Sequence, residues 1–355
     1  LEYTLHRTCV GGNKGIQKDL DDGIDTIGKK MTVCQLYAKQ IRHRGNVRYN
    51  TKNGRKRLMK LLEEDKLGGC PIDSVKLSDA KEWAIRMKEK GISYKTISND
   101  KRSLKAAFYT AIQDDCIRKN PFDFQLNTVI EDDTEPKVPL TPAQEESFLS
   151  FAQNDKVYQK YYDELIILLG TGLRISELCG LTDTDIDFEN RIINVDHQLL
   201  RSAETGYYIE TPKTKSGIRQ IPMSEKVYEA FNRVLKRRRG AKAVTIDGYS
   251  NFLFLNRDGY PKTATNYDGM FRGLAKKYNK YHEEALPKVM TPHTLRHTFC
   301  ANMANAGMNP KALQYIMGHS NITMTLNYYA HATFDSAMAE MKRLNKEKQQ
   351  ERLVA

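Results

Sequence analysis

Cysteine is sparse in this sequence and never paired. The 355 residues contain six cysteines, and none of them lies in a C-x-x-C motif: Cys9, Cys34, Cys70, Cys116, Cys179 and Cys300. Zinc sites and disulfide frameworks need closer and more regular spacing. The sequence therefore predicts no metal site and no disulfide, and it indicates reduced thiols in a cytosolic protein.

Long apolar runs are also missing. The longest candidate, Leu165–Leu169, spans five residues, whereas a membrane-spanning helix needs roughly 20. The first residues lack the basic-then-apolar pattern of a secretory signal. We expect no membrane segment and a cytoplasmic location. Because the sequence starts at Leu1 rather than at methionine, we also expect it to be a fragment of a longer chain.

Acidic residues are outnumbered by basic ones. The sequence has 56 lysines and arginines against 44 aspartates and glutamates, which gives a net charge of +12. Positive charge of this size attracts polyanions, nucleic acid first among them. The length allows two or three domains with cores of their own.

One stretch, residues 291–332, concentrates the chemically active side chains. It holds four of the eight histidines, one arginine and two adjacent tyrosines: His293, Arg296, His297, His319, Tyr328, Tyr329 and His331. Histidine changes charge near neutral pH, and arginine offers a fork of donors that suits a phosphate. The i, i+3, i+4 spacing of the first three places them on one helical face. The stretch predicts a phosphate-handling site, with Gly307 and Gly318 ending its helices.

The order of these pieces resembles a known family. H-x-L-R-H from His293, G-H-S from Gly318 and a tyrosine in a Y-A-H context resemble the tyrosine recombinases, the phage-integrase and Xer-like enzymes that cut and rejoin DNA. The family predicts two further pieces, and both are present: T-G-x-R-x-x-E at Thr171–Glu177, and a lysine hairpin at Thr211–Pro222. Residues 207–211 and 218–222 would form its strands. The resemblance extends from Met31 to the C-terminus.

The resemblance implies a role for each residue of the site. It gives two arginines that bind the scissile phosphate, two histidines that assist, a lysine general acid and a tyrosine nucleophile: Arg174, Arg296, His293, His319, Lys213 and Tyr329. Lys215 is the alternative acid. Tyr328, which has the ten-residue spacing from Gly318 found in some members, is the alternative nucleophile, although the Y-x-H context favours Tyr329. Glu177 is expected to orient the site, and His297 to pack or to form a hydrogen bond within the fold. No metal or cofactor is implied.

The expected fold is mixed α+β and mainly helical. The resemblance implies that residues 1–30 are a linker or the remnant of a missing arm-binding domain, and that the helical residues 31–122 are a core-binding domain. An acidic, proline-containing linker covers 123–139. A capping box at Thr141 and Gln144 starts the catalytic domain, 140–331, which contains a small antiparallel sheet. Residues 332–355 would form a C-terminal helix that docks onto a neighbouring subunit or folds back in cis.

Basic residues on the helices of residues 31–122 are candidates for DNA contact. We single out Lys52, Arg55, Lys56, Lys101, Arg102 and Lys105. One such residue alone is more often part of a solvated face, but together they suit a duplex, whose phosphates dominate affinity.

We therefore expect a bacterial recombinase that excises and integrates a mobile element, most like the integrases of conjugative transposons. A phage integrase, an Xer-like resolvase, a type IB topoisomerase and a regulator that binds without cutting are the alternatives. The resemblance implies double-stranded DNA at transposon ends and at the target or circular-intermediate junction as partner. It also implies a dimer on each site, a tetramer in the synapse, an accessory excision factor and association with the nucleoid.

Overall fold

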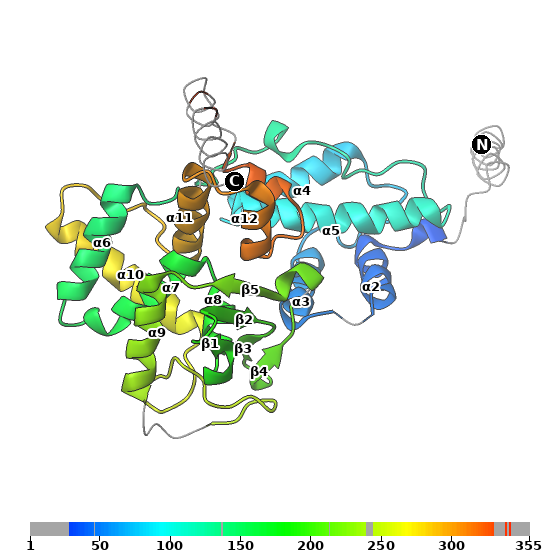
Figure 1. Cartoon of the computed structure of the whole chain (residues 1–355). Coiled ribbons are helices and arrows are strands. Elements are labelled where there is room, and N and C mark those ends of the chain that lie inside the picture. Colours follow the sequence, from blue (N-terminus) through cyan, green and yellow to red (C-terminus); the bar gives the residue numbers. More distant parts are fainter. Residues whose placement is uncertain are drawn as a thin grey trace, which may run out of the picture. The chain divides into compact units, whose positions relative to one another are not determined.

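The structure is a computed structural model that describes residues 28–45, 47–135, 138–212, 214–238 and 244–329, together with Met338 and Met341. Its contacts divide the chain into two compact units, residues 1–136 and 137–355 (Figure 1). Within the described part of the chain, no helix is long and apolar enough to cross a membrane. Of the expected segments 1–30 and 332–355, the structure describes only residues 28–30, Met338 and Met341.

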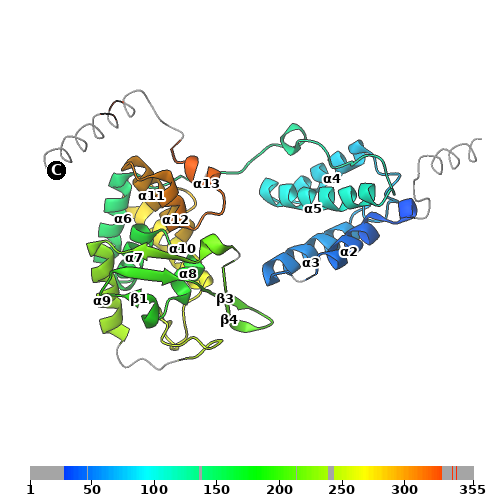
Figure 2. The same ribbon diagram turned by 45° about the vertical axis from the view of Figure 1, so that its right-hand side comes forward.

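The first unit is helical. Its elements are η1 (Gly28–Lys30), α2 (Val33–His43), α3 (Tyr49–Glu63), α4 (Leu77–Glu89), α5 (Tyr94–Gln113) and η2 (Leu126–Thr128). Helix α2 packs against α3 and α5, and α4 packs against α5, as Figure 2 shows. The core forms around Trp83, Phe108 and Phe122, all fully buried, with the ring of Phe122 5.8 Å from Trp83 and 5.3 Å from Phe108. Burial of these aromatic rings supplies much of the unit's stability.

The second unit carries most of the helices around a small amount of sheet. Its helices are α6 (Pro142–Asn154), α7 (Tyr162–Thr171), α8 (Ile175–Gly180), α9 (Glu225–Arg238), α10 (Ala264–Tyr281), α11 (Pro292–Asn305), α12 (Pro310–Met317) and α13 (Thr323–Leu326). Short 3-10 turns occur at η3 (Gln159–Tyr161), η4 (Asp183–Asp185) and η5 (Lys215–Gly217). The apolar helix α7 packs against both α9 and α11, and Leu165, Ile167 and Leu168 are fully buried there. Helix α7 is therefore the centre of this unit's core.

The predicted start of α6 is confirmed. The hydroxyl of Thr141 accepts a hydrogen bond from the Gln144 amide at 3.1 Å, and the Gln144 side chain accepts one from the Thr141 amide at 3.1 Å. This reciprocal pair satisfies two donors at the helix N-terminus.

The strands form two separate antiparallel sheets. One has the order β1 (Ile186–Asp187), β2 (Ile192–Val195) and β5 (Arg219–Pro222), and the other pairs β3 (Gln198–Ser202) with β4 (Gly206–Glu210). The mainly helical, mixed fold expected from the sequence is confirmed.

The expected pairing of the lysine hairpin is wrong. Strand β4 pairs with β3 rather than with β5, because Gly206 adopts a positive φ of 71° and lets the chain fold straight back on itself. Strand β5 pairs instead with β2, where the buried Ile221 lies opposite the buried Ile193. The segment that contains Lys215 thus connects two sheets, and it is not the turn of a single hairpin.

Candidate active site

Arg174 stands directly before α8 and is held by Glu177, one turn into that helix. The Arg174 amide donates to Oε2 of Glu177 at 2.8 Å, and its Nη1 donates to Oε1 at 2.6 Å. Its Nη2 donates to the carbonyl of Gly318 at 2.9 Å. The side chain is 37 % exposed, so the guanidinium is fixed in place yet still faces solvent.

Arg296 lies in the first turns of α11 and is buried, with 3 % of the residue exposed. Its Nη1 donates to the carbonyl of Gly172 at 2.5 Å, and its Nη2 donates to the carbonyl of Met317. Because Met317 and Gly318 are adjacent, the guanidiniums of Arg174 and Arg296 reach the same corner of the backbone. Two arginines 122 positions apart in the sequence therefore meet at the end of α12.

Gly318 makes this corner possible. It ends α12 with a φ of 61°, a conformation that suits glycine. A Cβ at this position would lie 3.0 Å from the carbonyl oxygen of Ser216 and 3.1 Å from Nη1 of Arg219. Glycine thus lets η5 and the start of β5 approach the end of α12, and His319 follows at once.

His319 is buried beside the arginines. Its Nδ1 lies 2.9 Å from the hydroxyl of Thr325 in α13. Burial, and then the positive charges of Arg296, Arg174 and Arg219 and of His297, lower the pKa of His319 to about 4. The ring is therefore neutral at pH 7. Thr325, which the sequence did not single out, holds it in orientation.

Glu177 has a second partner that the sequence-based reasoning missed. Arg219, at the start of β5, donates from Nη1 and Nη2 to the two carboxylate oxygens at 3.0 and 2.9 Å. Burial raises the pKa of Glu177, but the hydrogen bonds and charge of Arg219 and the charges of Arg174 and Arg296 outweigh it and lower the pKa to about 2. Glu177 is ionised at any pH at which the protein works.

The charges of this cluster do not balance. Arg174, Arg219 and Arg296 share the single carboxylate of Glu177. Burial and the neighbouring charge of Arg174 lower the pKa of Arg296 to about 9, which leaves it charged at pH 7. The excess positive charge suits an anion such as a phosphate.

Two histidines of α11 and one of the tyrosines lie next to one another. His293 is exposed, and its ring stands 4.7 Å from that of His297. The His297 ring in turn lies 5.6 Å from the ring of Tyr328. His297, expected only to pack or to form a hydrogen bond within the fold, therefore connects one predicted histidine with one of the two tyrosines.

The two adjacent tyrosines differ in their surroundings. The hydroxyl of Tyr329 donates to the carbonyl of Met308 at 2.5 Å, in the connection between α11 and α12. Burial, and then the neighbouring Cys300, raise the pKa of Tyr329 above its ordinary value. The Tyr329 hydroxyl is thus engaged with the backbone, whereas Tyr328 lies against the histidine.

Lys215 is exposed in η5, close to Gly217 and Arg219 in the sequence. Lys213 and His331 lie outside the described residues.

Comparison with known proteins identifies the family. Residues 139–336 match the phage integrase family. The chain belongs to this family. It is 71 % identical over 352 residues to the transposase from transposon Tn916 of Enterococcus faecalis, and the match covers 98 % of this chain and 87 % of the relative. The same identity and coverage relate it to the transposase from transposon Tn1545 of Streptococcus pneumoniae.

Solved structures of the family show the same similarity. The Tn1549 transposon integrase (residues 82–397) in complex with a circular intermediate DNA is 78 % identical, with a TM-score of 0.84, over 88 % of this chain and 99 % of that one. The same integrase with transposon right end DNA covers 89 % of this chain and 100 % of that one, at 78 % identity and a TM-score of 0.84. A lambda integrase dimer on a core site, 16 % identical with a TM-score of 0.57, shares the fold over 83 % of this chain and 75 % of that one. The expected tyrosine recombinase of a transposon is confirmed.

Two of these complexes carry substitutions whose spacing can be compared with this chain. One carries lysine in place of an arginine and the other phenylalanine in place of a tyrosine, at positions numbered 225 and 379, which are 154 apart. In this family member, the residue 154 positions after Arg174 is Tyr328.

Within the part of the chain that the structure describes, no group of potential metal ligands lies in this integrase's arginine cluster. Among the residues that the structure describes, only Asp185, Asp196 and His197 bring potential ligand atoms close enough to hold an ion. His197 already uses both ring nitrogens, one with the carbonyl of Gly180 at 2.8 Å and one with Asp196 at 2.5 Å. We interpret this group as a structural cluster at the end of α8.

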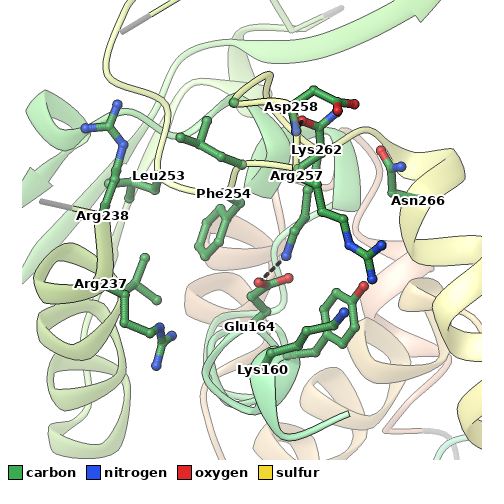
Figure 3. Close-up of a pocket in the computed structure, with 15 residues that line it drawn as sticks. Lys160, Glu164, Arg237, Arg238, Leu253, Phe254, Arg257, Asp258, Lys262 and Asn266 are labelled. Atoms are coloured by element: carbon green, nitrogen blue, oxygen red, sulfur yellow. Dashed lines mark hydrogen bonds and ion pairs between the residues drawn. The ribbon is translucent and has the colours of Figure 1, made fainter. Parts of the chain in front are cut away.

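The pocket in Figure 3 also lies apart from the predicted residues. It has a volume of about 800 Å3, and its lining comes from the start of α7, the end of α9, residues 253–259 and the start of α10. Its Lys262 is paired with the buried Glu164 at 2.5 Å. None of the predicted site residues lines it.

The predicted DNA-contacting residues of the first unit divide into two groups. Lys52, Arg55 and Lys56 line a groove of about 510 Å3 beside α3. Lys101 donates to the carbonyl of Phe124 at 2.5 Å, and Lys105 pairs with Asp123 at 2.5 Å. Arg102 is exposed on α5. The first group thus lies together on one helix, while the two lysines of α5 have partners within the unit.

Proposed function

We propose that this recombinase cuts and rejoins DNA at the ends of a conjugative transposon with Tyr328 as its nucleophile. The observation that carries the proposal is the meeting of Arg174 and Arg296 at the backbone of Met317 and Gly318. Two guanidiniums that remain charged can bind the non-bridging oxygens of a scissile phosphate and stabilise the charge of the transition state.

The reaction needs only groups of the protein and the DNA. The tyrosine oxygen attacks phosphorus and forms the 3′-phosphotyrosyl bond, while the bond to the 5′-oxygen breaks and that oxygen takes up a proton. Lys213 or Lys215 supplies that proton. His293 and the neutral His319 hydrogen bond the phosphate and assist proton transfer at the tyrosine. Attack by a 5′-hydroxyl reverses the step and rejoins the strand.

Three observations favour Tyr328 over Tyr329, the residue preferred from the Y-x-H context. The Tyr329 hydroxyl is engaged with the carbonyl of Met308, so it would have to break a hydrogen bond before attack. The Tyr328 ring lies beside His297. Its spacing from Arg174 also equals that of the two positions substituted in the Tn1549 complexes.

The remaining assignments extend this proposal to the whole chain. We infer that the substrates are transposon ends and the junction of a circular intermediate, the DNAs found with the Tn1549 integrase. Residues 31–122 bind the core site, with Lys52, Arg55 and Lys56 on α3 as the leading contacts. The protein acts in the bacterial cytoplasm at the nucleoid, as a dimer on each site and a tetramer in the synapse, with an accessory factor for excision. The C-terminal residues 332–355 dock onto a neighbouring subunit.

A nicked suicide substrate tests the proposal. After cleavage the short 3′ piece diffuses away, and the protein stays covalently attached to the DNA. We expect the unmodified chain and Tyr329→Phe to form the adduct, and Tyr328→Phe to bind DNA without forming it. Binding without adduct by the unmodified chain would instead support a regulator, and relaxation of supercoils without joining of two duplexes would support a topoisomerase.

A further inference from the structure

Arg219 is the most completely hydrogen-bonded arginine of the site, although no motif pointed to it. Its side chain is fully buried. Besides its two bonds to Glu177, its Nε donates to the carbonyl of Ile316 at 2.6 Å and its Nη1 to the carbonyl of Gly217 at 3.1 Å. It therefore joins the end of η5, the end of α12 and the start of α8.

Arg219 and Arg174 compete for the same carboxylate. Arg219 takes one donor to each oxygen of Glu177, which is the bidentate geometry that a guanidinium prefers. Arg174 is left with one side-chain bond, to Oε1, and places its Nη2 on the carbonyl of Gly318. Because Arg219 occupies Glu177, part of the Arg174 fork is kept free for another anion.

We propose that Arg219 is a positioning residue for the reaction: it holds Glu177 so that the Arg174 guanidinium faces the scissile phosphate. The inference rests on the proposed function. Arg219 does not reach the DNA itself, since its side chain has no exposed surface. Without Arg219, Glu177 would draw Arg174 into its own bidentate pair and use the donors meant for the phosphate.

Arg219→Lys tests the proposal, because a lysine keeps the charge but loses the fork. We expect single-turnover cleavage to slow about a hundred-fold, the size of effect that a small misplacement of a catalytic group produces. The dissociation constant for the DNA should not change, since the buried residue makes no DNA contact. Arg233→Lys is the matched control: Arg233 also pairs with a buried carboxylate, that of Asp163 at 2.8 Å, but away from the arginine cluster, and its variant should cleave normally.

A double-variant cycle with Arg174→Lys separates positioning from a general structural role. If Arg219 acts through Arg174, adding Arg219→Lys to Arg174→Lys costs little more. The proposal would be overturned if the double variant lost cleavage rate by the product of the two single losses. It would also be overturned if Arg219→Lys lost DNA affinity by the same factor as cleavage rate. Should Arg219→Lys fail to fold, as judged by circular dichroism, Arg219→Gln, which keeps an uncharged hydrogen-bond donor beside the Glu177 carboxylate, replaces it in the cycle.

The unmodified chain distinguishes a failure of the proposed function from a failure of the positioning role of Arg219. If it forms no covalent adduct with the suicide substrate, the proposed function fails. If it forms the adduct and Arg219→Lys cleaves as fast, only the positioning role fails.

Discussion

Replacing Glu177 with glutamine removes the negative charge on which the arginine cluster depends. The carboxylate accepts hydrogen bonds from the amide and side chain of Arg174 and from two nitrogens of Arg219. Glutamine keeps the size of the side chain but cannot balance the two guanidiniums. We therefore expect Glu177→Gln to destabilise the unit of residues 137–355.

The pKa of Glu177 gives the magnitude. A carboxyl whose pKa falls from its ordinary 4.5 to about 2 contributes about 3 kcal/mol to the free energy of unfolding at neutral pH. Breaking a buried ion pair by removing one partner costs a similar amount, about 3–5 kcal/mol. Both arguments predict a loss of about 3 kcal/mol for Glu177→Gln.

The pH dependence has a definite sign. Because the folded-state pKa is lowered, the contribution of Glu177 is complete above pH 4.5 and is lost as the pH falls from 4.5 to about 2. The unmodified chain should lose stability across this window more steeply than Glu177→Gln does. The two curves should converge at the acidic end.

Urea unfolding followed by two probes measures the effect. Circular dichroism reports both units, whereas fluorescence of Trp83, the one tryptophan of the chain, reports only the first unit. Glu229→Gln is the control, since Glu229 is exposed and pairs with Arg233 at 3.6 Å, and it should cost less than about 1 kcal/mol. A loss below about 1 kcal/mol for Glu177→Gln, or an unchanged pH slope, would refute this reasoning.

Three further outcomes follow from the site. Arg174→Lys should slow first-turnover cleavage about a hundred- to a thousand-fold while DNA binding, measured by filter retention, is kept. A parallel loss of binding would contradict the proposed role of Arg174 in stabilising the transition state. The pKa of His319 is lowered to about 4, so its ring should not titrate between pH 6 and 8. The cleavage rates of the unmodified chain and of His319→Gln should therefore depend on pH in the same way across this range. Thr325→Val removes the hydroxyl beside Nδ1 of His319 and should slow cleavage about fivefold, the value of one hydrogen bond; an unchanged rate would show that Thr325 does not orient the ring.

Local patterns predicted those features that depend on neighbouring residues. The capping box at Thr141 and the helix-ending glycines Gly307 and Gly318 adopt the expected conformations, because caps are set by a few adjacent side chains. The mainly helical, mixed fold was also predicted correctly. The motif residues Arg174 and Arg296 were recognisable since the family carries them in short, characteristic contexts.

Features that depend on partners far along the chain were harder to predict. The family resemblance implied a lysine hairpin with strands at residues 207–211 and 218–222, but strand partners depend on distant parts of the chain, so the hairpin was paired wrongly. Arg219 looked like any arginine of a basic chain, because only the fold shows that it is buried against Glu177. The choice between Tyr328 and Tyr329 is of the same kind, since the surroundings of each hydroxyl depend on α11 and its connection to α12.

The identity of the residue that becomes linked to DNA tests the central claim most directly. The suicide complex can be digested with trypsin, its DNA trimmed to a few nucleotides, and the peptide that contains both tyrosines fragmented in a mass spectrometer. We predict that the nucleotide mass lies on Tyr328. A nucleotide on Tyr329, or on a residue outside this pair, would contradict the proposed arrangement of nucleophile and arginines.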